Sequence, residues 1–98
     1  MTPQQIETNI KKIIFRHLSP KQYRIFVYGS RATNRARRWS DYDIGIIGKE
    51  KTPPAVLSNL SEELENSDIP VNVDVVDFHR VSDRFKNLAL YKIIPWTT

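Results

Sequence analysis

No cysteine occurs among the 98 residues of this chain. This absence excludes a disulfide-stabilised scaffold and a zinc site with cysteine ligands, and it is typical of a cytoplasmic protein. The two histidines, His17 and His79, are too few for a histidine-based metal centre. No apolar run is long enough to cross a bilayer, and the N-terminal residues do not have the pattern of a signal peptide. We therefore expect a cytoplasmic protein with no membrane partner.

The composition that is present is that of one ordinary globular domain. Apolar residues make up 40% of the chain and charged residues 27%, and we expect a single domain over residues 1–98 with a modest core. The net charge is only +4, but basic residues are concentrated in one short segment, at Arg31, Arg35, Arg37 and Arg38. Such a segment can attract a polyphosphate, RNA or an acidic protein surface, or it can be a solvated loop.

Cap residues and apolar spacing predict three helices. Thr2, Pro3 and Gln5 have the pattern of an N-cap, a first helical residue and a capping box. The expected helices begin at Thr2, at Thr52-Pro53 and at Ser82 or Asp83, and they end at Ser19-Pro20, at about Asn66 and at Ile94-Pro95. The apolar residues expected to face the core are Ile6, Ile10, Ile13, Ile14, Val56, Leu57, Leu60, Leu64, Phe85, Leu88 and Ala89.

Between these helices, runs of β-forming residues predict strands at residues 24–28, 41–47 and 71–77, and residues 31–37 form a short helix or an ordered loop. The strand at 41–47 is apolar on both faces in its inner part, which indicates a central position in a covered sheet. This order of elements indicates an α/β or α+β domain, with a small mixed sheet of about three strands flanked by helices.

Paired carboxylates stand at the start of the central strand. Asp41 and Asp43 are two residues apart and therefore share one strand face, where they repel each other unless a cation neutralises them. Asp74 lies inside an apolar strand, where desolvation disfavours a lone carboxylate. If the two strands are neighbours, one cation can serve all three acids. Oxygen-only ligation suits Mg²⁺ or Mn²⁺, and two such ions about 3.5–4 Å apart can activate an attacking hydroxyl and stabilise a leaving pyrophosphate.

Each acid also has a structural interpretation. Asp41 can be a cap or turn residue and Asp74 a buried salt-bridge partner, and spacing alone does not decide between these roles and metal binding. Asp77 alternates to the face opposite Asp74, so we interpret it as a strand-end residue, with a third metal ligand as the alternative. Ser40 can bond to the backbone at the start of the strand and orient the acids, or it can be a plain turn residue.

A Gly-Ser turn precedes the acids. Gly29 permits a positive φ and a close approach of the backbone to a ligand. Ser30 adds a hydroxyl and an N–H group at the start of the following turn or helix, where an anion is favoured. Turns use this residue pair routinely, so only its place after a strand and before the acids favours phosphate binding.

The combined pattern resembles a known family. Gly29-Ser30-Arg31-Ala32, followed after seven residues by Ser40-Asp41-Tyr42-Asp43, resembles the signature of the polymerase-β-like nucleotidyltransferases, and most closely their minimal nucleotidyltransferase (MNT) members. The resemblance extends to Val73-Asp74-Val75-Val76-Asp77 and covers most of the chain. It implies that Gly29 and Ser30 contact the triphosphate, and that Asp41, Asp43 and Asp74 are the catalytic and metal-binding residues.

Arg31 and Ser40, the remaining polar residues of the two motifs, are included in the predicted nucleotide-binding set. The resemblance implies ATP or another NTP as substrate and Mg²⁺, or alternatively Mn²⁺, as cofactor. Thr33-Asn34 stands where many members of the family have Arg-Gly. Asn tolerates the left-handed conformation, so the loop can be retained.

After the sheet and its helices are counted, we expect no residues to remain for the helical domain that holds the acceptor or the base in larger relatives. The resemblance therefore implies an acceptor on a second protein. Minimal nucleotidyltransferases are commonly paired with a small helical HEPN protein in a toxin–antitoxin system, in which they neutralise this RNase by transferring AMP to it, often onto a tyrosine. Trp96 and Tyr91 are candidate contact residues or core cover, and we favour core cover for Tyr91.

Three other functions remain open. The chain can be a non-catalytic subunit that neutralises a partner by contact, or a nucleotidyltransferase that modifies a small molecule such as an antibiotic. We rank direct nucleic-acid binding by the arginine segment last. The sequence does not identify the acceptor, the nucleotide, the oligomeric state or the role of Arg35, Arg37 and Arg38.

Overall fold

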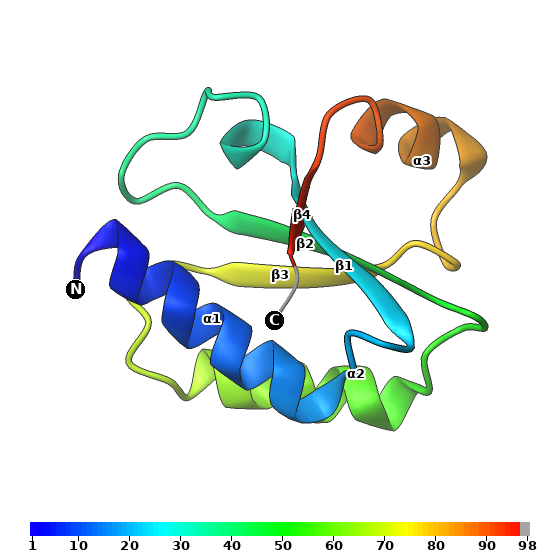
Figure 1. Cartoon of the computed structure of the whole chain (residues 1–98), viewed down its shortest axis with the longest axis horizontal. Helices are drawn as coiled ribbons and strands as arrows, with labels where there is room; N and C mark the ends of the chain where they lie inside the picture. Colours follow the sequence, from blue (N-terminus) through cyan, green and yellow to red (C-terminus); the bar gives the residue numbers. More distant parts are fainter. Residues whose placement is uncertain (97–98) are drawn as a thin grey trace.

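A computed structural model describes residues 1–96 of the chain (Figure 1). Helices alternate with strands along these residues, as the apolar spacing predicts. The elements are α1 (Pro3–His17), β1 (Tyr23–Tyr28), the 3₁₀-helix η1 (Gly29–Arg31), β2 (Tyr42–Gly48), α2 (Pro54–Glu65), β3 (Val73–Asp77), α3 (Asp83–Ala89) and β4 (Ile94–Trp96). The mixed α+β class is therefore confirmed.

One mixed sheet organises the molecule, with the strand order β3-β2-β1-β4. β1 is antiparallel to β2 and β4, whereas β2 and β3 are parallel and are connected through α2. The prediction that the strand carrying the paired acids is central is confirmed, because β2 pairs on both of its edges. Figure 1 shows α1 and α2 together on one side of the sheet, with η1, its following loop and α3 on the other side.

The larger core lies between the sheet and the pair of helices α1 and α2. The capping box at the start of α1 is confirmed, because the Thr2 hydroxyl accepts the Gln5 N–H and the Gln5 side chain accepts the Thr2 N–H. Glu63 of α2 binds Arg16 and His17 at the end of α1 and joins the two helices. The buried residues of this core include Ile6, Ile10, Ile13, Ile14, Leu18, Ile25, Val27, Tyr42, Ile44, Ile46, Leu60 and Leu64.

A smaller aromatic core covers the opposite face of the sheet. It consists of Phe26, Tyr28 and Phe78, with the Phe26 and Phe78 rings 5.0 Å apart at their centroids and nearly perpendicular. Gly45 of β2 lies beneath these rings, and a Cβ added there would lie 2.2 Å from the Phe26 ring. The aromatic core therefore depends on a residue without a side chain at this position of the central strand.

The C-terminal part of the fold differs from the prediction. The last helix ends at Ala89, and Ile94–Trp96 forms a fourth strand that pairs with β1. Trp96 is buried beside Tyr42, so it belongs to the core. The sequence prediction missed β4 because a three-residue strand has too little alternation to be recognised, and it forms only because the β1 edge is available for pairing.

Two side chains predicted to cover the core are exposed instead. Tyr91 is 90% exposed and Leu88 is 72% exposed. The short helix α3 packs against the aromatic core through Phe85 and Ala89, and Leu88 therefore faces solvent. Tyr91 lies in the turn after this helix, between Leu90 and Ile93, and these two residues pack on the aromatic core.

Helix α2 begins one residue later than predicted. Pro53 is its N-cap and makes no side-chain cap hydrogen bond. The N–H of Thr52 instead donates to Asp77 Oδ2 at 2.8 Å, and the N–H of His79 donates to Asp77 Oδ1 at 2.9 Å. Asp77 is buried and also faces Arg80 across 3.5 Å. Its predicted role as a strand-end residue is confirmed.

In residues 1–96 no helix is both long and apolar enough to span a membrane.

Candidate active site

Three side chains form a row across neighbouring strands. Tyr28 of β1 pairs with Asp43 of β2, and Asp43 pairs with Asp74 of β3. Partners in register project from the same face of a sheet. That face is the one opposite α1 and α2, because Tyr28 belongs to the aromatic core. The structure therefore confirms that the two acid-bearing strands are neighbours, and it places Asp43 beside Asp74.

The third predicted carboxylate, Asp41, lies just before β2 and is exposed. Burial raises the pKa of Asp43, and the nearby charges of Asp74 and then Asp41 raise it further. The three acids therefore form one electrostatic cluster. Within residues 1–96, however, no set of three acidic, histidine or cysteine side chains has the arrangement of a preformed metal site. The assignment of these acids as metal ligands accordingly stays a prediction.

The Gly-Ser turn approaches this cluster directly. Gly29 has a φ of 73°, in the left-handed region, and a Cβ added to it would lie 2.6 Å from Asp43 Oδ2. Glycine is therefore required here both for the backbone conformation and for the space beside the carboxylate. Ser30 follows in η1 and is partly buried. The two motifs, which are separated along the chain, meet at this point.

Tyr28 is a member of the row that the sequence prediction treated only as a strand residue. Burial raises its pKa to about 12, with further contributions from Asp43 and Asp74. The phenol is therefore protonated at neutral pH and remains a hydrogen-bond donor close to the carboxylates. Its place as the last strand residue before Gly29 is the only signal in the sequence, and it becomes informative once the pairing with Asp43 is known.

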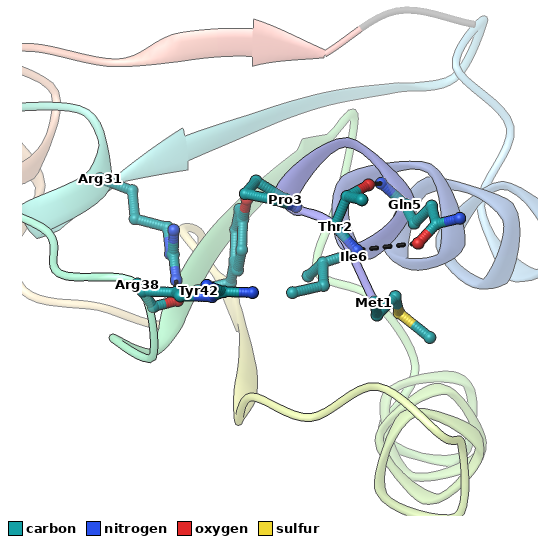
Figure 2. Close-up of a pocket in the computed structure, with 8 residues that line it drawn as sticks. All are labelled: Met1, Thr2, Pro3, Gln5, Ile6, Arg31, Arg38 and Tyr42. Atoms are coloured by element: carbon teal, nitrogen blue, oxygen red, sulfur yellow. Dashed lines mark hydrogen bonds between the residues drawn. The ribbon is translucent and has the colours of Figure 1, made fainter.

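The loop between η1 and β2 is organised by Arg31. Its Nη2 donates to the carbonyl of Ser40 at 2.6 Å and to that of Arg38 at 3.2 Å, and its Cζ lies 4.0 Å from the centroid of the Tyr42 ring. Figure 2 shows Arg31, Arg38 and Tyr42 along one wall of a cavity of about 510 Å³, with the N-terminal residues of α1 opposite. The Arg31 side chain is thus turned toward the loop and not toward the row of acids.

Ser40 is likewise engaged within the loop. Its hydroxyl accepts the Arg37 N–H at 2.8 Å, and its own N–H donates to the Arg37 carbonyl at 3.1 Å. These contacts close a turn, which was one of the two roles expected for Ser40. The predicted nucleotide contacts of Arg31 and Ser40 gain no support from these side-chain positions. Asn34 has a φ of 61°, so the expected left-handed residue in this loop is confirmed.

Residues 8–94 match the family model "Polymerase beta, Nucleotidyltransferase". The chain belongs to the polymerase-β nucleotidyltransferase family. A Haemophilus influenzae protein of this kind, named "Probable protein adenylyltransferase MntA", is 33% identical over 82 residues, which are 84% of this chain and 71% of that protein. The resemblance to minimal nucleotidyltransferases is therefore confirmed.

Solved structures share the fold of this family member. A chain of a toxin–antitoxin complex with AMP-PNP has a TM-score of 0.73 and 25% identity, over 94% of this chain and 73% of that one. A chain of a Shewanella oneidensis complex between a tri-AMPylated HEPN toxin and an MNT antitoxin has a TM-score of 0.71 and 22% identity, over 99% of this chain and 74% of that one. The second likeness shows the fold alone.

The chemistry of the acid cluster fits the divalent metal that nucleotidyltransferases of this family use. Asp41, Asp43 and Asp74 offer hard carboxylate oxygens, which are the ligands that Mg²⁺ and Mn²⁺ prefer. Burial raises the pKa of Asp43, and the negative charges of Asp74 and Asp41 raise it further. The close approach of Gly29 to Asp43 leaves no room for a side chain between this turn and the acids. A divalent cation would relieve the repulsion within the cluster.

Proposed function

We propose that this chain is a metal-dependent nucleotidyltransferase that transfers a nucleoside monophosphate, AMP from ATP, to a hydroxyl group of a partner protein. The observation that carries the proposal is the register of Asp43 with Asp74, beside the Gly29 turn. The identity to a protein named as a protein adenylyltransferase supports AMP and a protein acceptor. Gly29 and Ser30 are the proposed triphosphate contacts, with Mg²⁺ as the cofactor and Mn²⁺ as the alternative.

Asp41, Asp43 and Asp74 would hold the cation, which supplies charge stabilisation for the triphosphate and lowers the pKa of the acceptor hydroxyl. In the transfer, the acceptor oxygen forms a bond to the α-phosphorus of ATP and the bond to the pyrophosphate oxygen breaks. The hydroxyl proton passes to a carboxylate of the row or to water. Tyr28 remains protonated beside Asp43 and Asp74 and can donate a hydrogen bond to the reacting groups.

The proposed acceptor is a helical HEPN-type toxin, with this chain as the antitoxin in the cytoplasm. Residues 1–96 build a single sheet and the helices that cover it, so we propose one domain and an acceptor supplied by the partner. Solved complexes that share this fold contain a toxin together with its antitoxin, which supports such a pairing. Direct nucleic-acid binding forms no part of the proposal.

The test is the intact mass of the partner protein after incubation with this chain, ATP and Mg²⁺. We expect the mass to increase by whole AMP units. Asp43→Asn and Asp74→Asn should each slow the transfer by about 100-fold or more, because ligand loss removes several kcal/mol of transition-state stabilisation. Asp68→Asn, which changes an exposed acid in the turn after α2, is the matched control and should transfer at the wild-type rate. Transfer at the wild-type rate by the Asp43→Asn protein would refute the assignment of Asp43 to the active site.

A second candidate function is neutralisation of the partner by contact alone. The observation in its favour is the exposure of Leu88 and Tyr91 at and after the end of α3, which can serve as apolar contacts for another protein. Coexpression of the toxin with the Asp43→Asn chain separates the two functions. Loss of protection against the toxin supports transfer chemistry, whereas full protection without any mass increase of the toxin supports simple masking.

A further inference from the structure

Arg31 contacts both residues that flank Asp41. On the N-terminal side its Nη2 donates to the Ser40 carbonyl at 2.6 Å, and on the C-terminal side its guanidinium lies over the Tyr42 ring at 4.0 Å. A further hydrogen bond to the Arg38 carbonyl, at 3.2 Å, fixes the preceding turn. One side chain from η1 therefore holds the loop immediately before Asp41 and the strand immediately after it.

The positive charge of Arg31 is directed at Tyr42 rather than at the acids. The Cζ of Arg31 lies 4.0 Å from the centroid of the Tyr42 ring, and its Nη2 donates to the carbonyls of Arg38 and Ser40. Tyr42 belongs to the core beneath α1, and Asp43 projects from the opposite face of β2. Although η1 lies on the side of the sheet away from α1 and α2, the Arg31 guanidinium contacts Tyr42 on the face of β2 opposite Asp43 (Figure 1).

Asp41 has little else to fix its position. Asp43 is paired with Tyr28 on one side and with Asp74 on the other, whereas Asp41 precedes β2 and is exposed. The nearest strand hydrogen bond is the one from the Tyr42 N–H to the Asn72 carbonyl, at 2.9 Å. The backbone at Asp41 is therefore set largely by the contacts of its two neighbours, and Arg31 makes one contact to each of them.

We propose that Arg31 is a positioning residue, which sets the backbone of Asp41 for the transfer reaction and does not contact the nucleotide. The planar guanidinium can donate to two carbonyls while its face stacks on an aromatic ring, and a lysine ammonium cannot reproduce this geometry. Misplacement of a reacting group by about 1 Å can cost about 100-fold in rate. This inference rests on the proposed function, because it assigns Asp41 a part in that reaction.

The experiment compares Arg31→Ala and Arg31→Lys with Arg37→Ala, which removes an exposed arginine from the same loop. For each protein, the kcat and the KM for ATP are measured in the transfer to the partner protein. Hydrogen exchange is measured at the Ser40 and Tyr42 amides, which are hydrogen-bonded in the structure. Arg31→Lys keeps the charge and much of the stem, so it provides the test if the alanine protein does not fold.

We expect kcat to fall by about 10- to 100-fold in both Arg31 variants, with the KM for ATP near that of the wild type and faster exchange at both amides. Arg37→Ala should match the wild type in every measurement. A raised KM with unchanged kcat, or recovery of activity by lysine, would show instead that Arg31 contributes charge to nucleotide binding. Unchanged exchange at Ser40 and Tyr42 would also overturn the proposal. If the wild type transfers no AMP, the proposed function fails, while the exchange data still report whether Arg31 positions this segment.

Discussion

Replacing Gly29 with alanine tests the contact between the turn after β1 and the Asp43 carboxylate. The backbone at Gly29 is left-handed, and an alanine Cβ would lie 2.6 Å from Asp43 Oδ2. The left-handed conformation costs an L-residue about 1–2 kcal/mol. The carboxylate must also turn away from the new methyl group, at a cost of about 0.5–1.5 kcal/mol for an unfavourable rotamer. The expected loss in the free energy of unfolding is therefore about 1.5–3.5 kcal/mol.

A double-mutant cycle separates these two costs. In an Asp43→Ala background the carboxylate is gone, so Gly29→Ala should cost only the backbone strain of about 1–2 kcal/mol. The coupling energy between the two substitutions should then be about 0.5–1.5 kcal/mol, within the range found for residues in contact. Urea denaturation of the wild type, the two single variants and the double variant, followed by circular dichroism, measures all four free energies.

The same substitution should affect activity more than stability. Displacement of the Asp43 carboxylate from the row should slow AMP transfer by about 100-fold or more, although most of the protein remains folded. Two results would refute this reasoning. An equal cost of Gly29→Ala in both backgrounds would show that the methyl group does not meet the carboxylate, and no cost in either would show that the turn is not left-handed.

Three further predictions concern charge and pH. Because the pKa of Asp43 is raised in the folded protein, this carboxyl group lowers stability as pH rises above its ordinary pKa range, so Asp43→Asn should raise the melting temperature at pH 7 but not at acid pH. Spectrophotometric titration should show Tyr28 ionising near pH 12, and at a lower pH in an Asp74→Asn protein. An unchanged Tyr28 pKa in that variant would contradict the placement of Tyr28 and Asp74 in one row. Arg16 and His17 lower the pKa of Glu63, so ionised Glu63 stabilises the fold above its ordinary pKa range, and this contribution is lost as the pH falls through the lowered pKa. Glu63→Gln should therefore reduce the melting temperature slightly at pH 7. A difference in melting temperature that persists in acid would argue against this ion pair.

Local signals in the sequence were sufficient for much of the fold. The capping box at Thr2 and Gln5 fixes the start of α1 with side chains three residues apart, so it can be recognised without tertiary information. The central position of β2 follows from its apolar residues on both faces. The register between Asp43 and Asp74 did not follow from spacing. It depends on the crossover through α2, and only the prediction that both acids serve one site implied it.

The features that the sequence did not reveal depend on contacts between distant segments. The strand β4 exists because Ile94–Trp96 pairs with β1. The position of Tyr28 in the acid row depends on pairing across the sheet. The contacts of Arg31 depend on the path of the following loop, which brings the carbonyls of Arg38 and Ser40 back to the Arg31 guanidinium. Because none of these contacts leaves a periodic pattern in the chain, motif and periodicity arguments could not supply them.

The central claim is that this chain transfers AMP to a protein at the site formed by Asp41, Asp43 and Asp74. Its most direct test is the intact mass of the partner protein after incubation with ATP, Mg²⁺ and either the wild-type chain or the Asp74→Asn chain. The account predicts that the partner gains whole AMP units with the wild type and stays essentially unmodified with Asp74→Asn over the same time. Equal modification by both chains, or no modification by the wild type of a toxin that it neutralises, would contradict it.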